Sequence, residues 1–255
     1  MKLGMPILYE FMSIEENVKL AKELNLDFVE LNLNFPYCRK DIENHKVQEL
    51  IKKYDIEFTL HFYDEADFGS YREIVDAYIY LLKRYMNILK DDIKLVNFHN
   101  NPGPVVTISG KKNYIYKNEY DEYIKRNIQN FKLAKEVLDD YKVLMTIENV
   151  DFKNSDFLVN NYSYYKKEGF KFNYDIGHDY LNNDILYDFA LNNKNDFLEF
   201  HFHDATKDMC HLSLKNGEMD LKKYKNLISD GLRYVVIEVK SSKDLTKSIP
   251  IFNEL

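Results

Sequence analysis

The stretch Phe172-Asn173-Tyr174-Asp175-Ile176-Gly177-His178 has the pattern of a short apolar strand that ends in an acid. A histidine follows three residues after the acid, so the end of this strand offers two candidate metal ligands. Taken alone, the pair is equally consistent with an aspartate that caps the next helix and a histidine that binds a main-chain carbonyl. The functional interpretation gains weight because apolar runs that end in Glu, Asp or His recur along the chain.

Short apolar runs alternate with amphipathic helical patterns from one end of the chain to the other. The expected strands span residues 1–9, 27–33, 56–61, 95–99, 143–148, 172–175, 197–201 and 234–239. Strict alternation of eight strand-helix units predicts an α/β fold, a single parallel eight-stranded (β/α)8 TIM barrel domain over residues 1–255. A doubly wound open sheet is less favoured, because no glycine-rich phosphate turn follows the first run.

The expected helices and the two longest connections complete this pattern. Helices are expected at residues 13–24, 43–54, 70–89, 119–138, 155–167, 184–191 and 221–229, and a last helix closes the chain. The first begins with a capping box, in which Glu16 follows Ser13 by three residues. Residues 100–118 and 204–218 are expected to be loops. The first of these is interpreted either as a lid over a pocket or as a solvated surface loop.

The composition favours a cytoplasmic protein that acts on neither nucleic acid nor membranes. Hydrophobic residues make up 45% of the chain, which is enough for a full core, and the formal net charge is −7. No apolar stretch approaches the roughly 18 residues of a membrane span. Cys38 and Cys210 lack CxxC spacing, so we expect two free thiols and neither a disulfide framework nor a cysteine zinc site.

Six of the expected strands end in an ionisable side chain. In a parallel barrel the carboxyl ends of all strands meet on one face, where active sites lie, so these side chains should point into one pocket. An alternative role for any one of them is a hydrogen bond to a loop. The residues are His61, His99, Glu148, Asp175, His201 and Glu238.

Carboxylates and imidazoles without thiolates are the ligands that suit Mn, Mg, Co, Fe or Zn. A centre made of four of these residues would hold one divalent metal and stay open to substrate oxygens. Its members would be Glu148, Asp175, His201 and Glu238. Four further histidines would supply enough ligands for two or three metals, and these are His61, His99, His178 and His211.

The order of these motifs along the chain resembles the xylose isomerase-like barrel superfamily, which contains sugar isomerases, sugar epimerases, inosose dehydratase-like enzymes and endonuclease IV. The motifs are LHFYDEADF at His61, VNFHNNPG at His99, TIENV at Glu148, DIGH at Asp175, FHFHDATK at His201 and VIEV at Glu238. The resemblance covers nearly the whole chain. It implies that Glu148, Asp175, His201 and Glu238 are the metal ligands.

Two histidines near the seventh strand compete for one role in this scheme. In the family, the ligand is followed three residues later by an acid, and Asp204 stands in that relation to His201. The resemblance therefore implies that His201 binds the metal. His203 points the same way on an extended strand and is assigned to a substrate contact instead.

The resemblance implies a divalent-metal-dependent isomerase or epimerase that acts on a sugar or sugar phosphate. Its chemistry would be proton transfer next to a carbonyl through a metal-bound enediolate, with Mn, Mg, Co or Zn as cofactor. Glu148 and Glu238 would be the catalytic base and acid. His178 would bind a substrate oxygen, and Lys207 is the cation nearest to the position where some epimerases carry an arginine. The partner would be a small carbohydrate, and relatives often form homo-oligomers.

The alternative within the same superfamily is an endonuclease IV-like zinc phosphodiesterase that acts on abasic DNA. Its ligand set matches His61, His99, Glu148, Asp175, His178, His201, His211 and Glu238. Against this reading, Met209 replaces an acid that the nuclease carries two residues before His211, and the chain is short for DNA-probing loops. A third reading is a barrel that keeps the ligands only for a structural or binding role.

Overall fold

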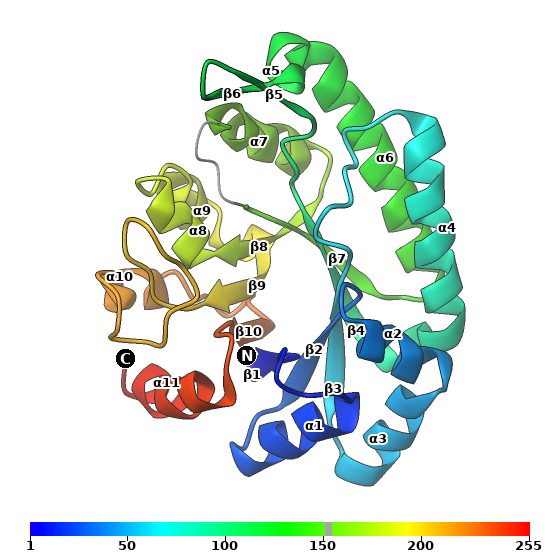
Figure 1. Cartoon of the computed structure of the whole chain (residues 1–255), viewed down its shortest axis with the longest axis vertical. Coiled ribbons are helices and arrows are strands. Elements are labelled where there is room, and N and C mark those ends of the chain that lie inside the picture. Colours follow the sequence, from blue (N-terminus) through cyan, green and yellow to red (C-terminus); the bar gives the residue numbers. More distant parts are fainter. Residues whose placement is uncertain (151–154) are drawn as a thin grey trace.

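Eight parallel strands close into a barrel in the computed structural model, which describes residues 1–150 and 155–255 (Figure 1). The strands follow one another around the barrel in chain order, and β10 pairs with β1 to close the sheet. The predicted TIM barrel is therefore confirmed. The barrel strands are β1 (Lys2–Pro6), β2 (Phe28–Asn32), β3 (Glu57–His61), β4 (Ile93–His99), β7 (Leu144–Glu148), β8 (Lys171–Asp175), β9 (Phe197–Phe202) and β10 (Tyr234–Ile237).

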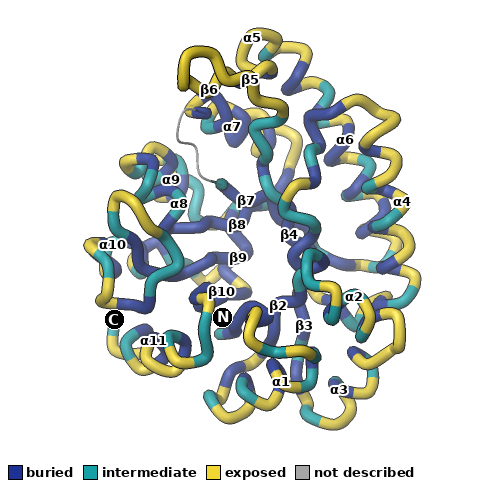
Figure 2. Tube along the Cα trace, viewed as in Figure 1, coloured by how far each residue is buried: buried dark blue, intermediate teal, exposed yellow. Residues whose placement is uncertain are grey.

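Helices surround the barrel and cover its outer surface, so both faces of the strands are buried (Figures 1 and 2). The Ser13 hydroxyl accepts a hydrogen bond from the Glu16 amide at 3.3 Å, which confirms the predicted cap of the first helix. The helices are α1 (Ile14–Glu23), α2 (Pro36–Glu43), α3 (Lys46–Tyr54), α4 (Arg72–Leu89), α5 (Ile115–Asn118), α6 (Tyr120–Asp140), α7 (Val159–Lys167), α8 (Ile176–Leu181), α9 (Tyr187–Asn192), α10 (Leu221–Lys225) and α11 (Ser242–Glu254). Single 3₁₀ turns lie at Lys90–Asp92, Asp156–Leu158 and Lys194–Asp196.

The helix predicted over residues 43–54 corresponds to α3, which begins at Lys46, and it is preceded by α2 at Pro36–Glu43, a helix that the sequence pattern did not predict. The chain breaks at His45, whose φ of 59° is left-handed, and α3 starts at the following residue. His45 is exposed, as expected for a surface residue. A second difference lies after β8, where the additional short helix α8 precedes α9, which begins at Tyr187 rather than at residue 184.

The predicted loop over residues 100–118 contains a β-hairpin, made of β5 (Val105–Ile108) and β6 (Lys111–Tyr114). The turn residues Ser109 and Gly110 both have positive φ, at 49° and 79°, which is the backbone of a type I′ turn. The Ser-Gly pair was the sequence signal for this hairpin. The other predicted loop, at residues 204–218, contains one antiparallel bridge between Asp204 and Leu212.

The barrel interior changes character along its axis. At the amino-terminal ends of the strands, a small apolar cluster fills the interior, with Phe28 against Tyr234 at a ring-centroid distance of 5.1 Å. A Cβ at Gly4 would collide with the Phe28 ring, so glycine allows this close packing. Towards the carboxyl-terminal ends the inward-facing side chains become polar. The free energy gained from apolar burial thus comes from one end of the barrel and from the helical layer.

Both cysteines are free thiols, as predicted. Within residues 1–150 and 155–255, none of the helices has the length and apolarity that crossing a membrane requires.

Candidate metal centre

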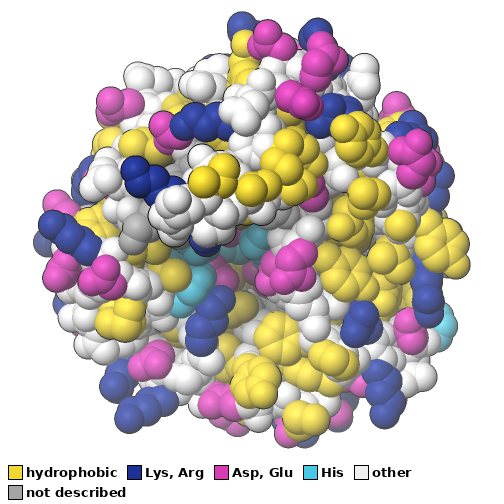
Figure 3. Space-filling view, turned by 45° about the horizontal axis from the view of Figure 1, so that its top comes forward, with side chains coloured by type: hydrophobic (Ala, Val, Ile, Leu, Met, Phe, Trp, Pro, Cys, Tyr) yellow, Lys and Arg dark blue, Asp and Glu magenta, His cyan; other side chains and the backbone are white. Residues whose placement is uncertain are grey.

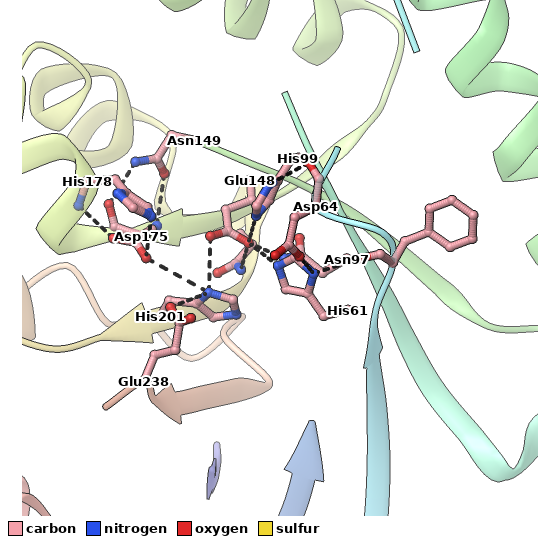
Figure 4. Close-up of polar contacts among 12 residues, drawn as sticks. His61, Asp64, Asn97, His99, Glu148, Asn149, Asp175, His178, His201 and Glu238 are labelled. Atoms are coloured by element: carbon pink, nitrogen blue, oxygen red, sulfur yellow. Dashed lines mark hydrogen bonds and ion pairs between the residues drawn. The ribbon is translucent and has the colours of Figure 1, made fainter. Parts of the chain in front are cut away.

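The ionisable strand ends predicted from the sequence lie together at the carboxyl-terminal mouth of the barrel (Figure 4). His61, His99, Glu148 and Asp175 are the last residues of their strands, while His201 is the penultimate residue of β9 and Glu238 directly follows β10. The space-filling view shows histidine side chains in a hollow on this side of the molecule (Figure 3). The period of two along each strand explains the convergence, because every second residue faces the barrel axis.

Four of these side chains form a compact group, each with one ligand atom within 4.8 Å of the others, and they are Glu148, Asp175, His201 and Glu238. The Nδ1 atom of His201 lies 3.1 Å from an oxygen of Glu148 and 3.1 Å from an oxygen of Glu238. An oxygen of Asp175 lies 4.0 Å from the same nitrogen. All four residues are buried.

This donor set fits a divalent cation. Three carboxylates in a buried space repel one another, and one imidazole supplies at most one positive charge. A doubly charged ion would remove that imbalance, and oxygen and imidazole donors suit Mn, Mg, Co or Zn. The Oε2 atom of Glu238 is buried without a hydrogen-bond partner, which is consistent with an oxygen that serves as a metal ligand.

The electrostatics of the four residues follow from their closeness. Burial would raise the pKa of Glu148, but His201 and the other histidines lower this pKa well below its usual value. Burial likewise opposes ionisation of Glu238, and Lys240, His211 and His201 lower its pKa well below the normal range. Both glutamates are therefore carboxylates at neutral pH, which is the state that binds cations and accepts protons.

His61 and His99 form a second group with Glu148. The Nδ1 atom of His61 lies 2.8 Å from the carbonyl oxygen of Phe62, and that of His99 lies 3.1 Å from the carbonyl oxygen of Asp64. A carbonyl can only accept, so each Nδ1 carries the proton and donates. Burial lowers the pKa of His99, so its ring is neutral with a bare Nε2. Despite burial, Asp64 and Glu148 raise the pKa of His61 well above 6.5, so this ring carries a proton on each nitrogen in the metal-free protein. The Nε2 atoms of His61 and His99 lie 3.3 Å and 3.9 Å from the same Glu148 oxygen. A bare nitrogen is the form that binds a metal.

Asp175 acts as a helix cap as well as a member of the cluster. Its Oδ1 atom accepts a hydrogen bond of 2.7 Å from the main-chain amide of His178, at the start of α8. Its Oδ2 atom faces His201. Asp175 therefore makes both kinds of contact that the sequence allowed. Its Oδ1 atom caps the helix, and its Oδ2 atom faces the candidate metal group.

His203 and His211 form a third group with Asp175 and Glu238. The main-chain amide of His211 donates to Nδ1 of His203 at 2.9 Å, and Nε2 of His203 lies 3.0 Å from Asp175. In this arrangement Nε2 carries the proton and holds the carboxylate. Burial lowers the pKa of His211 to about 3, so its ring is neutral. His178 lies beside this group, with its ring centroid 5.3 Å from that of His211.

Among the residues that the structure describes, Lys240 is the cation with an ion pair to the cluster. Its Nζ atom lies 2.7 Å from Oε1 of Glu238, whereas Lys207 is exposed on the loop after β9. Lys240 also lines a cavity of about 70 Å³ at the mouth of the barrel, together with Pro6, Ile7, Leu8, Tyr9, Glu30, Asn32, Phe35, His61 and Glu238. The sequence signal was the lysine two residues after Glu238, on the same side of an extended chain.

A polar layer beneath the cluster was not found from the sequence. The side-chain amides of Asn97 and Asn173 both donate to Oε2 of Glu148, the latter at 3.1 Å. Glu30 and Glu199 are also buried in this layer. Asn97, Asn173 and Glu199 each lie two residues before a strand-end histidine or acid, so the period of two could have identified them.

Comparisons with known proteins identify the family and the fold of the chain. The model of the family described as Xylose isomerase-like TIM barrel matches residues 18–252 of the chain. No curated protein sequence matched.

Three similar solved structures cover nearly the whole chain. A D-tagatose 3-epimerase-like protein is 20% identical, with a TM-score of 0.73 over 100% of this chain and 96% of its own. The D-allulose 3-epimerase from Methylomonas sp., solved in complex with D-allulose, is 13% identical with a TM-score of 0.71, over 100% and 96%. The IOLI protein, solved with a bound zinc atom, is 13% identical with a TM-score of 0.70, over 99% and 96%. At these identities the likeness establishes the shared fold.

Proposed function

Because the chain belongs to the xylose isomerase-like TIM barrel family, we propose that it is a divalent-metal-dependent isomerase or epimerase of a sugar or sugar phosphate. The observation that carries the proposal is the buried group of Glu148, Asp175, His201 and Glu238, whose donor atoms lie within 4.8 Å of one another. The epimerases among its structural neighbours support it, and so does the neighbour with a bound zinc atom.

The reaction proposed is proton transfer at a carbon next to a carbonyl. A divalent ion held by the four residues would polarise the substrate carbonyl and stabilise negative charge on its oxygen. Glu148 and Glu238 are the groups proposed to move the proton, because both are ionised and both face the same nitrogen of His201. A positioned acid-base group of this kind contributes about 10²–10⁴-fold to the rate.

The surroundings of the two glutamates suggest unequal roles. Glu238 borders the mouth cavity and is held there by Lys240, so it is placed to meet substrate directly. Glu148 is 1% exposed and is fixed from below by Asn97 and Asn173. Asn32 and Lys240 line the cavity with polar groups, while Leu8 and Phe35 offer apolar contacts, a mixture that suits a small carbohydrate.

The test is solvent deuterium exchange into ketoses by the purified protein, with Mn²⁺, Co²⁺, Mg²⁺ or Zn²⁺ added after treatment with a chelator. We expect metal-dependent incorporation of deuterium next to the carbonyl. Failure of exchange across a panel of free and phosphorylated ketoses, with metal demonstrably bound, would contradict the proposal.

A zinc phosphodiesterase resembling endonuclease IV is the second candidate, and one observation favours it. The Nε2 atoms of His61 and His99 both face Glu148, which would provide a further metal position beside the first. Met209, 57% exposed, stands where the nuclease pattern requires an acid, and this weakens the candidate. Three zinc ions per chain, with cleavage of an abasic duplex, would establish the nuclease and exclude the isomerase.

A further inference from the structure

We propose that Glu30 is a positioning residue for the metal centre, because its carboxylate holds the imidazole of His201 with Nδ1 directed towards the ion. The inference rests on the metal site of the proposed function but not on its substrate. It assigns a role to a buried glutamate of β2 that belongs neither to the four candidate ligands nor to the proposed proton-transfer pair.

The two nitrogens of His201 face different partners. Nδ1 lies 3.1 Å from Glu148 and 3.1 Å from Glu238, within the candidate ligand group. Nε2, on the other side of the ring, lies 3.4 Å from Oε1 of Glu30. Glu30 is 2% exposed and His201 is fully buried, so water competes little for this contact.

This contact determines which nitrogen carries the proton. In the metal-bound protein the His201 ring is neutral and has one N–H, and a carboxylate can only accept it, so Glu30 favours the form protonated at Nε2. Nδ1 is then bare and can bind a cation. Without Glu30, the proton would be better placed on Nδ1, which lies 3.1 Å from an oxygen of Glu148 and 3.1 Å from an oxygen of Glu238. With a proton on Nδ1, the ring would have no lone pair directed at the ion that the carboxylates attract.

The fold brings these two residues together from a distance. β1 and β10 lie between β2 and β9 in the barrel, so Glu30 reaches His201 across the interior rather than from a neighbouring strand. A carboxylate that orients a metal-binding histidine commonly contributes 10- to 100-fold to metal affinity.

Glu199 provides a matched control. It is the other buried glutamate of this layer, and it lies two residues before His201 on β9. Its Oε2 atom accepts a hydrogen bond of 3.4 Å from the hydroxyl of Thr146. Replacement of either glutamate by glutamine keeps the volume, so a general disturbance of the polar layer should affect both variants equally.

The experiment measures the binding of Mn²⁺ and Zn²⁺ alone to the full chain, for the wild type, Glu30→Gln and Glu199→Gln. We expect Glu30→Gln to weaken binding by about 10- to 100-fold, and Glu199→Gln to stay within about threefold of wild type. Nitrogen-15 NMR of the Zn²⁺-bound protein should show the His201 proton on Nε2 in the wild type and a weaker Nε2 proton signal in Glu30→Gln.

Three results would overturn the proposal. The first is unchanged metal affinity and an unchanged His201 proton in Glu30→Gln, and the second is an equal loss in both variants. The third is loss of a second bound ion from Glu30→Gln, since Glu30, Glu199 and His201 also group closely enough to hold one. If Glu30→Gln does not fold, Glu30→Asp keeps the charge but shortens the reach, and it should weaken metal binding. Because no substrate is used, failure of the isomerase proposal leaves this result intact.

Discussion

The two ends of the barrel interior are lined by the same strands but filled by opposite chemistry. At the amino-terminal end Phe28, Leu95, Tyr234 and Val236 pack together into an apolar cluster. At the carboxyl-terminal end, Glu148, Asp175, His201 and Glu238 crowd into a buried space. Apolar burial stabilises the fold, whereas buried charges cost free energy unless they are compensated. The comparison indicates that one end carries stability and the other carries chemistry.

The largest effect that we expect is a loss of catalytic turnover when a carboxylate is removed from the polar end. Glu148→Gln and Glu238→Gln each remove a carboxylate that is proposed to move a proton, so we expect losses of about 10²–10⁴-fold in deuterium exchange. Both variants should fold, because glutamine keeps the volume of each side chain, although the stability that the ionised glutamates add is lost. The measurement is exchange at saturating metal, with thermal unfolding followed in parallel. Full activity in either variant would contradict the proposal that Glu148 and Glu238 both transfer protons.

The opposite end should show the opposite behaviour. Phe28→Ala removes a fully buried ring from the apolar cluster, and we expect it to lower the free energy of unfolding by about 3–5 kcal/mol. Metal affinity should remain near that of the wild type, since the ring lies near the far end of the strands from the ligands. Urea unfolding and metal titration measure the two quantities. A large loss of metal affinity in a folded Phe28→Ala protein would show that the two ends are not independent.

Sequence patterns revealed the ends of the strands better than their interiors. His61, His99 and Glu148 stand out because an ionisable residue terminates an apolar run. Asn97 and Asn173 lie inside strands and are marked only by their spacing from His99 and Asp175. Glu30 lacks such a neighbour, and the alternation around it looks the same whether its side chain faces solvent or the barrel axis. Only closure of the sheet decides between these directions, and closure depends on pairing between residues far apart in the chain.

The hydrogen-bond partners of each histidine ring could not be predicted from the sequence either. The Nδ1 atoms of His61 and His99 contact the main-chain carbonyls of Phe62 and Asp64, whose directions are set by the loop after β3. The hairpin at Val105–Tyr114 was interpreted as a loop because prolines and glycines surround it. The Ser-Gly turn is a weaker hairpin signal than Asn-Gly or Asp-Gly.

The dependence of stability on pH offers a smaller test of the polar end. In the metal-free protein the lowered pKa values of Glu148 and Glu238 add stability above the ordinary value of 4.5, and this is lost as the pH falls below it. Despite burial, Glu148 and its neighbouring acids raise the pKa of His201 well above 6.5, so its contribution is present below 6.5 and is lost as the pH rises further. We therefore expect greatest stability of the metal-free protein between about pH 4.5 and 6.5.

Bound metal should alter the alkaline side of that profile. A ligand histidine is neutral, so an ion at the cluster replaces the charge that His201 loses as the pH rises. Thermal unfolding from pH 3 to 9, with and without Zn²⁺, measures both limbs. Identical alkaline limbs in the two conditions would argue against His201 as a ligand.

The smallest predicted effect concerns Lys240, at the rim between the polar cluster and solvent. Its ammonium group lies 2.7 Å from Oε1 of Glu238, but its side chain is 59% exposed, so solvent weakens the pair. Lys240→Gln should raise the pKa of Glu238 and move the acid limb of the pH-rate profile to higher pH, with only a severalfold loss of kcat/KM at neutral pH. The exposed Lys243, in the first turn of α11, provides the control Lys243→Gln, which should leave the profile unchanged. An unshifted acid limb in Lys240→Gln would mean that Glu238 is held ionised by the cluster alone, and a loss as large as that of Glu238→Gln would place Lys240 in the chemistry itself.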